Sequence, residues 1–160
     1  MKIVRVIIAV AVLAGAGFWA SSSAGKPPAP APSLREKIIG TWKLEARTVQ
    51  KPDGSVTPLP GWDHAVGYIT YDRTGNMSLQ FMQVGRTKES GTNSYVAYFG
   101  PYTLDERTKT VMHHHAGDLN PAGVDTTQPR ELVLQGDKLS ILIRNANSPD
   151  VNVNSFTRMK

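Results

Sequence analysis

The chain of 160 residues predicts a single domain, and its 40% hydrophobic and 19% charged residues are an ordinary globular balance. The formal net charge is +5, or about +3 without Lys2 and Arg5, and no dense basic run strengthens it, which argues against a nucleic-acid-binding protein. The absence of cysteine excludes disulfides, thiolate metal sites, cysteine nucleophiles and a lipid-modified cysteine.

Residues 1–24 have the three-part order of a secretory signal peptide. Lys2 and Arg5 supply a charged start, and an apolar run follows over residues 6–20. Ser22 and Ala24 then place small side chains before a cleavage site. The apolar run is shorter than the roughly 20 residues of a membrane-spanning helix, and an uncleaved N-terminal anchor is the alternative. Either way the sequence predicts an exported protein, periplasmic or secreted, without membrane contact beyond this segment.

Residues 25–33 predict a linker between the leader and the domain. Residues 26–32 read KPPAPAP. Proline fixes φ and removes an amide donor, so this stretch is expected to be extended and semi-rigid. The folded domain is therefore predicted to cover residues 34–160.

Short strands separated by turns are the pattern of residues 34–160. The clearest case is residues 76–81, where Met77, Leu79 and Phe81 alternate with polar residues at period two. One helical turn is expected at residues 34–39, and Gly100-Pro101 predicts a bend or an edge position. Strands are expected at residues 42–49, 56–59, 65–71, 76–81, 95–104, 110–116, 130–134, 138–143 and 151–158, with long loops at 84–92 and 117–128. This pattern is typical of a β-sandwich or a β-barrel.

Several motifs point to one family. Gly40-Thr41-Trp42 opens the first expected strand and Arg158 lies on the last, an arrangement that resembles the Gly-x-Trp and late Arg of lipocalins. Further pieces resemble the bacterial lipocalin-like domain family in the expected order: residues 67–71 (GYITY), 74–78 (TGNMS), 98–102 (YFGPY), 111–114 (VMHH), 120–121 (NP) and Arg130. Together they span residues 38–158.

The resemblance implies an all-β, antiparallel up-and-down barrel of about eight strands. It also implies structural roles for Trp42, whose indole closes one end of the barrel, and Arg158, whose guanidinium packs over that ring. His115, Pro101 and Phe156 depart from the family's usual residues. No activity follows from the resemblance, because a fold does not determine a function.

Three consecutive histidines, residues 113–115, are the most unusual feature. Alternate side chains of a strand face opposite sides, so His113 and His115 are expected on one face and His114 on the other. One interpretation is that they line the barrel and bond to tyrosine or loop groups. A second makes His113 an acid–base group. A third is a metal site with His64, Asp118 or Asp125 as third ligand. With no informative ligand spacing, we predict no bound metal or cofactor.

If Arg130 faces inward, it needs a partner. In one interpretation that partner is a ligand carboxylate or phosphate, and in another it is Glu131 or a loop acid. The third interpretation is that Arg130 faces solvent. Tyrosines suit an apolar pocket that requires a few hydrogen bonds, although ordinary core packing is the alternative for each of them. The predicted ligand-binding residues are His113, His115, Arg130, Tyr68, Tyr98 and Tyr102.

The leading hypothesis is an exported protein that binds a small, mostly apolar or amphipathic molecule inside the barrel, since an eight-stranded barrel holds one small ligand. The runner-up is an enzyme of isomerase or cyclase type with His113 as acid–base group. A metal-binding or structural envelope protein is the third hypothesis. No phosphate-binding loop, G-x-S-x-G or H-E-x-x-H motif is present.

Overall fold

The fold is known from a computed structural model that describes residues 30–160. The predicted signal peptide and residues 25–29 of the predicted linker lie outside the described residues. Within residues 30–160, no helix has the length and apolar character needed to cross a membrane.

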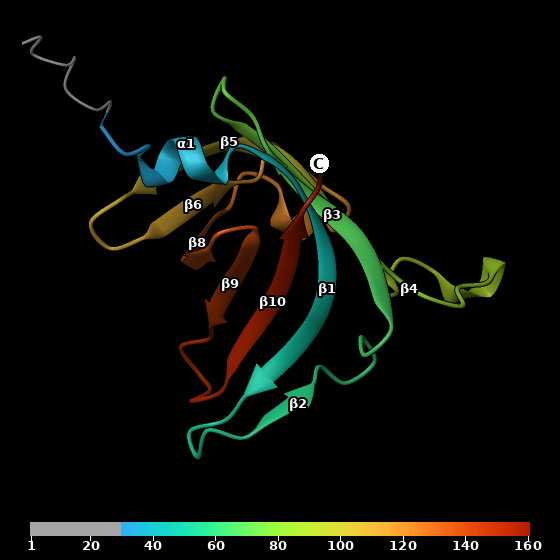
Figure 1. The fold of residues 1–160 in the computed structure, drawn as a ribbon. Coiled ribbons are helices and arrows are strands. Elements are labelled where there is room, and N and C mark those ends of the chain that lie inside the picture. Colours follow the sequence, from blue (N-terminus) through green and yellow to red (C-terminus); the bar gives the residue numbers. More distant parts are fainter. Residues whose placement is uncertain (1–29) are drawn as a thin grey trace, which may run out of the picture. The chain divides into compact units, whose positions relative to one another are not determined.

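Eight antiparallel strands form a closed barrel, as predicted (Figure 1). Each strand pairs with the next along the chain, and the last pairs with the first. The barrel strands are β1 (Gly40–Gln50), β3 (Ala65–Tyr71), β4 (Asn76–Gln83), β5 (Tyr95–Asp105), β6 (Thr110–His114), β8 (Thr127–Gln135), β9 (Lys138–Arg144) and β10 (Val151–Arg158).

Short elements complete the domain. The strand β2 (Val56–Pro58) pairs with the end of β1, and β7 (Gly117–Asp118) pairs with β5. The expected helical turn is α1 (Leu34–Ile38), which lies at one end of the barrel (Figure 1). The two expected loops contain 3-10 turns, η1 (Lys88–Ser90) and η2 (Pro121–Gly123), and β8 begins three residues before its predicted start.

Alternation along the strands places apolar side chains inside the barrel. Met77, Leu79 and Phe81 of β4 are all buried, as their period-two spacing predicted. They belong to one hydrophobic core, whose other buried members are Ile38, Trp42, Leu44, Ile69, Tyr71, Tyr98, Tyr102, Val111, Leu132, Leu139, Ile141 and Phe156.

The predicted pair of Trp42 and Arg158 closes the barrel end beside α1. The two residues are register partners of β1 and β10, and the guanidinium carbon lies 4.1 Å from the indole centroid. Arg158 also donates to the carbonyl of Lys37, in the last turn of α1, and to that of Ile39, which follows the helix, the second at 2.8 Å. The indole Nε1 donates to the Ile38 carbonyl at 2.8 Å. The pair therefore ties the helix to both terminal strands.

At Gly100 the structure departs from the prediction. Strand β5 runs through Gly100-Pro101 without interruption, but its partner changes from β7 to β6 there. A Cβ on Gly100, whose φ is 155°, would lie 2.0 Å from the His114 carbonyl oxygen. The chain after β6 approaches the backbone of β5 closely at this contact and pairs with β5 again as β7 in a register shifted by one residue, so β6 ends at His114, two residues earlier than predicted.

We expect Arg158→Met to lower the free energy of unfolding by about 1–2 kcal/mol, because it removes the cation–π contact and the hydrogen bonds to the end of α1. Urea unfolding followed by circular dichroism measures this change. Arg107→Met is the control, since the Arg107 side chain is 85% exposed. Equal stability of the two variants would contradict a structural role for Arg158.

Candidate ligand-binding cavity

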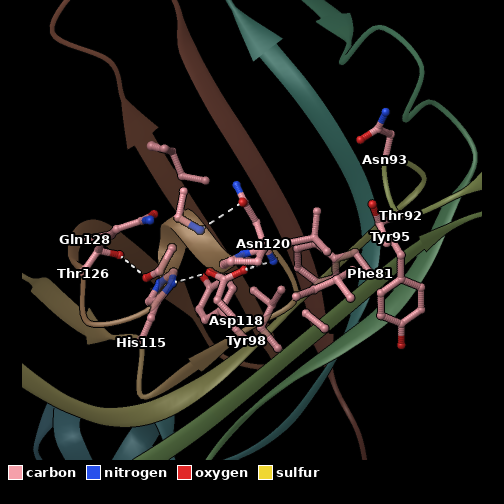
Figure 2. A pocket seen from close by; sticks show the side chains of 18 of the residues that line it. Phe81, Thr92, Asn93, Tyr95, Tyr98, His115, Asp118, Asn120, Thr126 and Gln128 are labelled. Atoms are coloured by element: carbon pink, nitrogen blue, oxygen red, sulfur yellow. Dashed lines mark hydrogen bonds and ion pairs between the residues drawn. The ribbon is translucent and has the colours of Figure 1, made fainter.

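A cavity of about 620 Å³ is lined by strands β1, β4, β5, β8, β9 and β10 and by the loops around residues 92–93 and 118–126 (Figure 2). This volume lies in the range of small-molecule sites. The apolar part of the lining includes Leu79, Phe81, Val96, Leu119 and Ile143. The polar part includes Arg47, Tyr98, His115, Asp118, Asn120, Gln128, Arg130 and Asn154.

His115 and Asp118 form a buried pair on this lining. Nδ1 of His115 lies 2.7 Å from Oδ2 of Asp118, and the histidine is only 2% exposed. A carboxylate accepts hydrogen bonds, so Nδ1 carries a proton, and in the neutral ring Nε2 is left as an acceptor. Nε2 is buried and has no hydrogen-bond partner among residues 30–160. The pair therefore presents one ring nitrogen without a hydrogen-bond partner in the described residues.

The short segment that follows β6 holds this pair in place. The backbone N–H of His115 donates to Thr126, and its carbonyl accepts from Asp125. Oδ1 of Asp118 accepts from the backbone of Asn120 at 2.8 Å. A Cβ on Gly123 would lie 2.2 Å from Oδ2 of Asp118, so η2 packs directly against the carboxylate. Figure 2 shows His115, Asp118 and Tyr98 together beneath this loop.

Two arginines of the lining have no carboxylate partner. Arg130 is 8% exposed and donates to the Pro129 carbonyl at 2.9 Å and to the side-chain oxygen of Gln128. Arg47 donates from Nε to Asn154 at 3.1 Å. Among residues 30–160, no acid lies within ion-pair distance of either guanidinium.

The environment of Arg47 is apolar. Its guanidinium carbon lies 4.2 Å from the centroid of Trp62 and 5.3 Å from that of Phe81. Nη1 is buried without a hydrogen-bond partner in the described part of the chain. Burial lowers the pKa of Arg47 to about 10, so the side chain keeps its positive charge at neutral pH.

His113 belongs to a separate buried network. The hydroxyl of Tyr71 lies 2.8 Å from its Nε2, and that of Tyr98 lies 3.1 Å from its Nδ1. Burial holds the pKa of His113 well below its ordinary value, and the neighbouring charge of Arg130 lowers it further. The neutral ring thus links β3, β5 and β6, because each of its nitrogens forms a hydrogen bond with a tyrosine hydroxyl.

Tyr98 connects the two histidines. Its hydroxyl meets His113, while its ring stacks on His115 with centroids 3.9 Å apart and planes 12° apart. Burial raises the pKa of Tyr98, and the charges of Arg130 and Arg47 oppose that effect. The pKa of this tyrosine therefore responds to both guanidiniums.

The structure brings some of the predicted ligand-binding residues together and separates others. His115, Arg130 and Tyr98 line the cavity. Tyr102 lies in the core, where its hydroxyl donates to the Asp72 carbonyl at 3.0 Å. Tyr68 is 40% exposed on the outer face of β3, since Ile69 and Tyr71 take the inward positions. The role of each of these residues in binding stays a prediction.

His113 and His115 are both buried inside the barrel, as expected. His114 lies on the outer face, where its Nδ1 is 2.8 Å from the hydroxyl of Thr127. No three His, Asp or Glu side chains within residues 30–160 are grouped so as to hold a metal ion. Asp118, considered above as a metal ligand, is instead the hydrogen-bond partner of His115.

Arg47 lines the cavity but is not among the predicted ligand-binding residues, and the reason is a β-bulge in β1. Trp42 and Leu44 face inward, so strict alternation places Arg47 outside. The pairing of β1 with β10 shifts register between Leu44 and Ala46. A bulge inserts one residue and reverses the faces that follow, so Arg47 turns inward opposite Asn154.

Comparison with known proteins gives one family match. Residues 39–155 match the lipocalin-like domain family. Two solved structures are similar at 15% identity. One is a lipocalin-like protein from Bacteroides uniformis ATCC 8492, with a TM-score of 0.46, 76% of this chain and 98% of that chain covered. The other is an uncharacterized protein from Bacteroides eggerthii DSM 20697, with a TM-score of 0.44, and 76% and 99% covered. No curated protein matches.

The depressed pKa of His113 predicts an acid-sensitive fold. Below pH 6.5 the unfolded chain takes up a proton that the folded state does not, so the stabilisation is complete above this pH and is lost as the pH falls. We expect the free energy of unfolding to drop by up to about 1.4 kcal/mol per pH unit between pH 6 and pH 5, and His113→Gln to flatten this slope.

Urea unfolding at pH 7, 6 and 5 measures both slopes. His64→Gln is the matched control, because the His64 side chain is 84% exposed. If the wild type and His113→Gln lose stability in parallel, His113 is not the responsible group.

Proposed function

The chain belongs to the lipocalin-like domain family, and on this basis we propose that its barrel binds one small, mostly apolar molecule in the cavity described above. The observation that carries this proposal is the cavity itself. About 620 Å³ lies among side chains of the barrel strands and two loops, with apolar residues on one part of the lining and polar groups on another.

Two buried polar atoms support a ligand with some polar character. Nε2 of His115 and Nη1 of Arg47 belong to residues of the same lining, and neither has a partner within residues 30–160. Buried polar groups without hydrogen bonds are costly, typically by about 1–3 kcal/mol each. A bound molecule that offers a donor to the histidine and an acceptor to the arginine would remove this cost.

We also propose that the protein meets this molecule outside the cytoplasm, in the periplasm or after secretion. The support is the order of charged, apolar and small residues over residues 1–24. No cofactor is required for binding of this kind, and the partner that we propose is the small molecule alone.

Native mass spectrometry tests the binding proposal. The protein is produced from the full chain, with its own leader and without a His tag. We expect an extra mass that leaves on denaturation. Ile143→Trp should abolish this mass, because Ile143 lines the cavity and the larger ring fills it.

Val133→Trp is the matched control, since Val133 is 41% exposed and does not line the cavity. It should leave the extra mass in place. An extra mass that survives in Ile143→Trp would place the ligand elsewhere and overturn the proposal.

Acid–base catalysis on the bound molecule is a second candidate function. It is favoured by the pair of His115 and Asp118, and no longer by His113, whose ring nitrogens both meet tyrosine hydroxyls. Nε2 of His115 would accept a proton from the ligand, and the carboxylate would stabilise the resulting imidazolium. This chemistry suits an isomerase or cyclase reaction.

Comparison of the molecules released by the wild type and by His115→Gln separates the two functions. A catalyst releases product from the wild type and substrate from the variant, so the two molecules differ in structure and in chromatographic retention. A carrier releases the same molecule from both. His114→Gln serves as control, because His114 lies on the other side and does not line the cavity.

A further inference from the structure

The positive and negative charges of the side chains that line the cavity are not equal in number. Arg47 and Arg130 contribute two positive charges to the lining, and Asp118 contributes one negative charge. Asp118 is bonded to His115 and not to either arginine. Charged groups removed from water are normally paired, so one positive charge in the lining is left without a counterpart.

Elsewhere on the barrel, some arginines have carboxylate partners within ion-pair distance and others, such as the solvent-exposed Arg73 and Arg86, have none among residues 30–160. Three arginines outside the cavity lining do have carboxylate partners: Arg144 with Glu131 at 3.1 Å, Arg158 with Asp137 at 3.5 Å and Arg107 with Asp105 at 3.8 Å. Desolvation makes an ion pair more necessary inside a protein than on its surface. The buried Arg130 and the part-buried Arg47 therefore need a counter-charge more than a solvent-exposed arginine does, and residues 30–160 do not supply one.

Both guanidiniums are held before any ligand arrives. Arg130 is fixed by Gln128 and by the Pro129 carbonyl. Arg47 is fixed by Asn154 and by the flanking rings of Trp62 and Phe81. All five of these contacts of the two guanidiniums are to neutral groups, and a guanidinium carries five N–H donors, so donors remain for a further acceptor. Preorganised donors of this kind favour a planar, bidentate oxyanion.

From this arrangement we propose that the cavity selects a molecule with a singly charged carboxylate head group and an apolar body, and that Arg130 and Arg47 bind the carboxylate. This inference rests on the proposed binding function and names the ligand class. One negative charge balances the lining. A phosphate monoester would bring a second charge close to Asp118 without a positive partner. The apolar body would contact Leu79, Phe81 and Ile143.

The test uses the full chain and two fluorescent probes, 11-(dansylamino)undecanoic acid and its methyl ester, which differ in the charge of the head group. We expect the wild type to bind the acid about tenfold or more tightly than the ester. Arg130→Met and Arg47→Met should each weaken binding of the acid by about tenfold and leave the ester within about twofold. Retained ester binding shows that a variant has folded.

Arg144→Met is the control, because Arg144 has a surface partner and does not line the cavity. It should bind both probes like the wild type. Competition against the acid probe distinguishes the head groups, and dodecanoate should displace it at lower concentration than dodecyl phosphate.

Equal binding of acid and ester by the wild type would overturn the carboxylate inference and leave the binding function intact. Stronger displacement by dodecyl phosphate would overturn the choice of a single charge. Failure of both probes to bind would overturn the inference together with the proposed function.

Discussion

Pairing of the first barrel strand with the last is the constraint on which the rest of the structure depends. Register between β1 and β10 sets Trp42 against Arg158 at one end of the barrel and Arg47 against Asn154 further along. The first pair closes the barrel end beside α1, and the second contributes to the cavity lining. The bulge after Leu44 separates the part of β1 that closes the barrel end from the part that lines the cavity, because it changes which residues of β1 point inward. Closure also leaves no open edge between the terminal strands.

Neighbouring histidines serve different purposes because of what surrounds them. His113 is neutral and has tyrosine hydroxyls on both nitrogens, so it stabilises the barrel interior. His115 shares Tyr98 with it, but its second nitrogen has no partner in the described residues. The difference arises from the chain after β6, which places a carboxylate beside His115 and none beside His113. Candidate chemistry therefore resides in His115, two residues from the histidine that the sequence favoured.

Much of the fold could be predicted from the sequence, because alternation and turn residues are local signals. Residues 65–71 and 151–158 were predicted with the bounds of β3 and β10, and the helical turn of α1 lies where it was expected. The candidate site was less accessible. Tyr68 lies outside the barrel because Ile69 and Tyr71 take the inward-facing positions of β3. Arg47 turns inward only because of a bulge. The partnership of His115 with Asp118 depends on how a loop returns to β5, which no local pattern encodes.

The contact between Arg158 and Ile39 joins residues 119 positions apart, and this separation has a consequence for the order of folding. Long-range pairing of this kind is slow to form, because the loop-closure entropy is spent before the contacts are made. The barrel cannot close until β10 has been synthesised, so the nascent chain carries an unpaired edge of β1 until that strand is available.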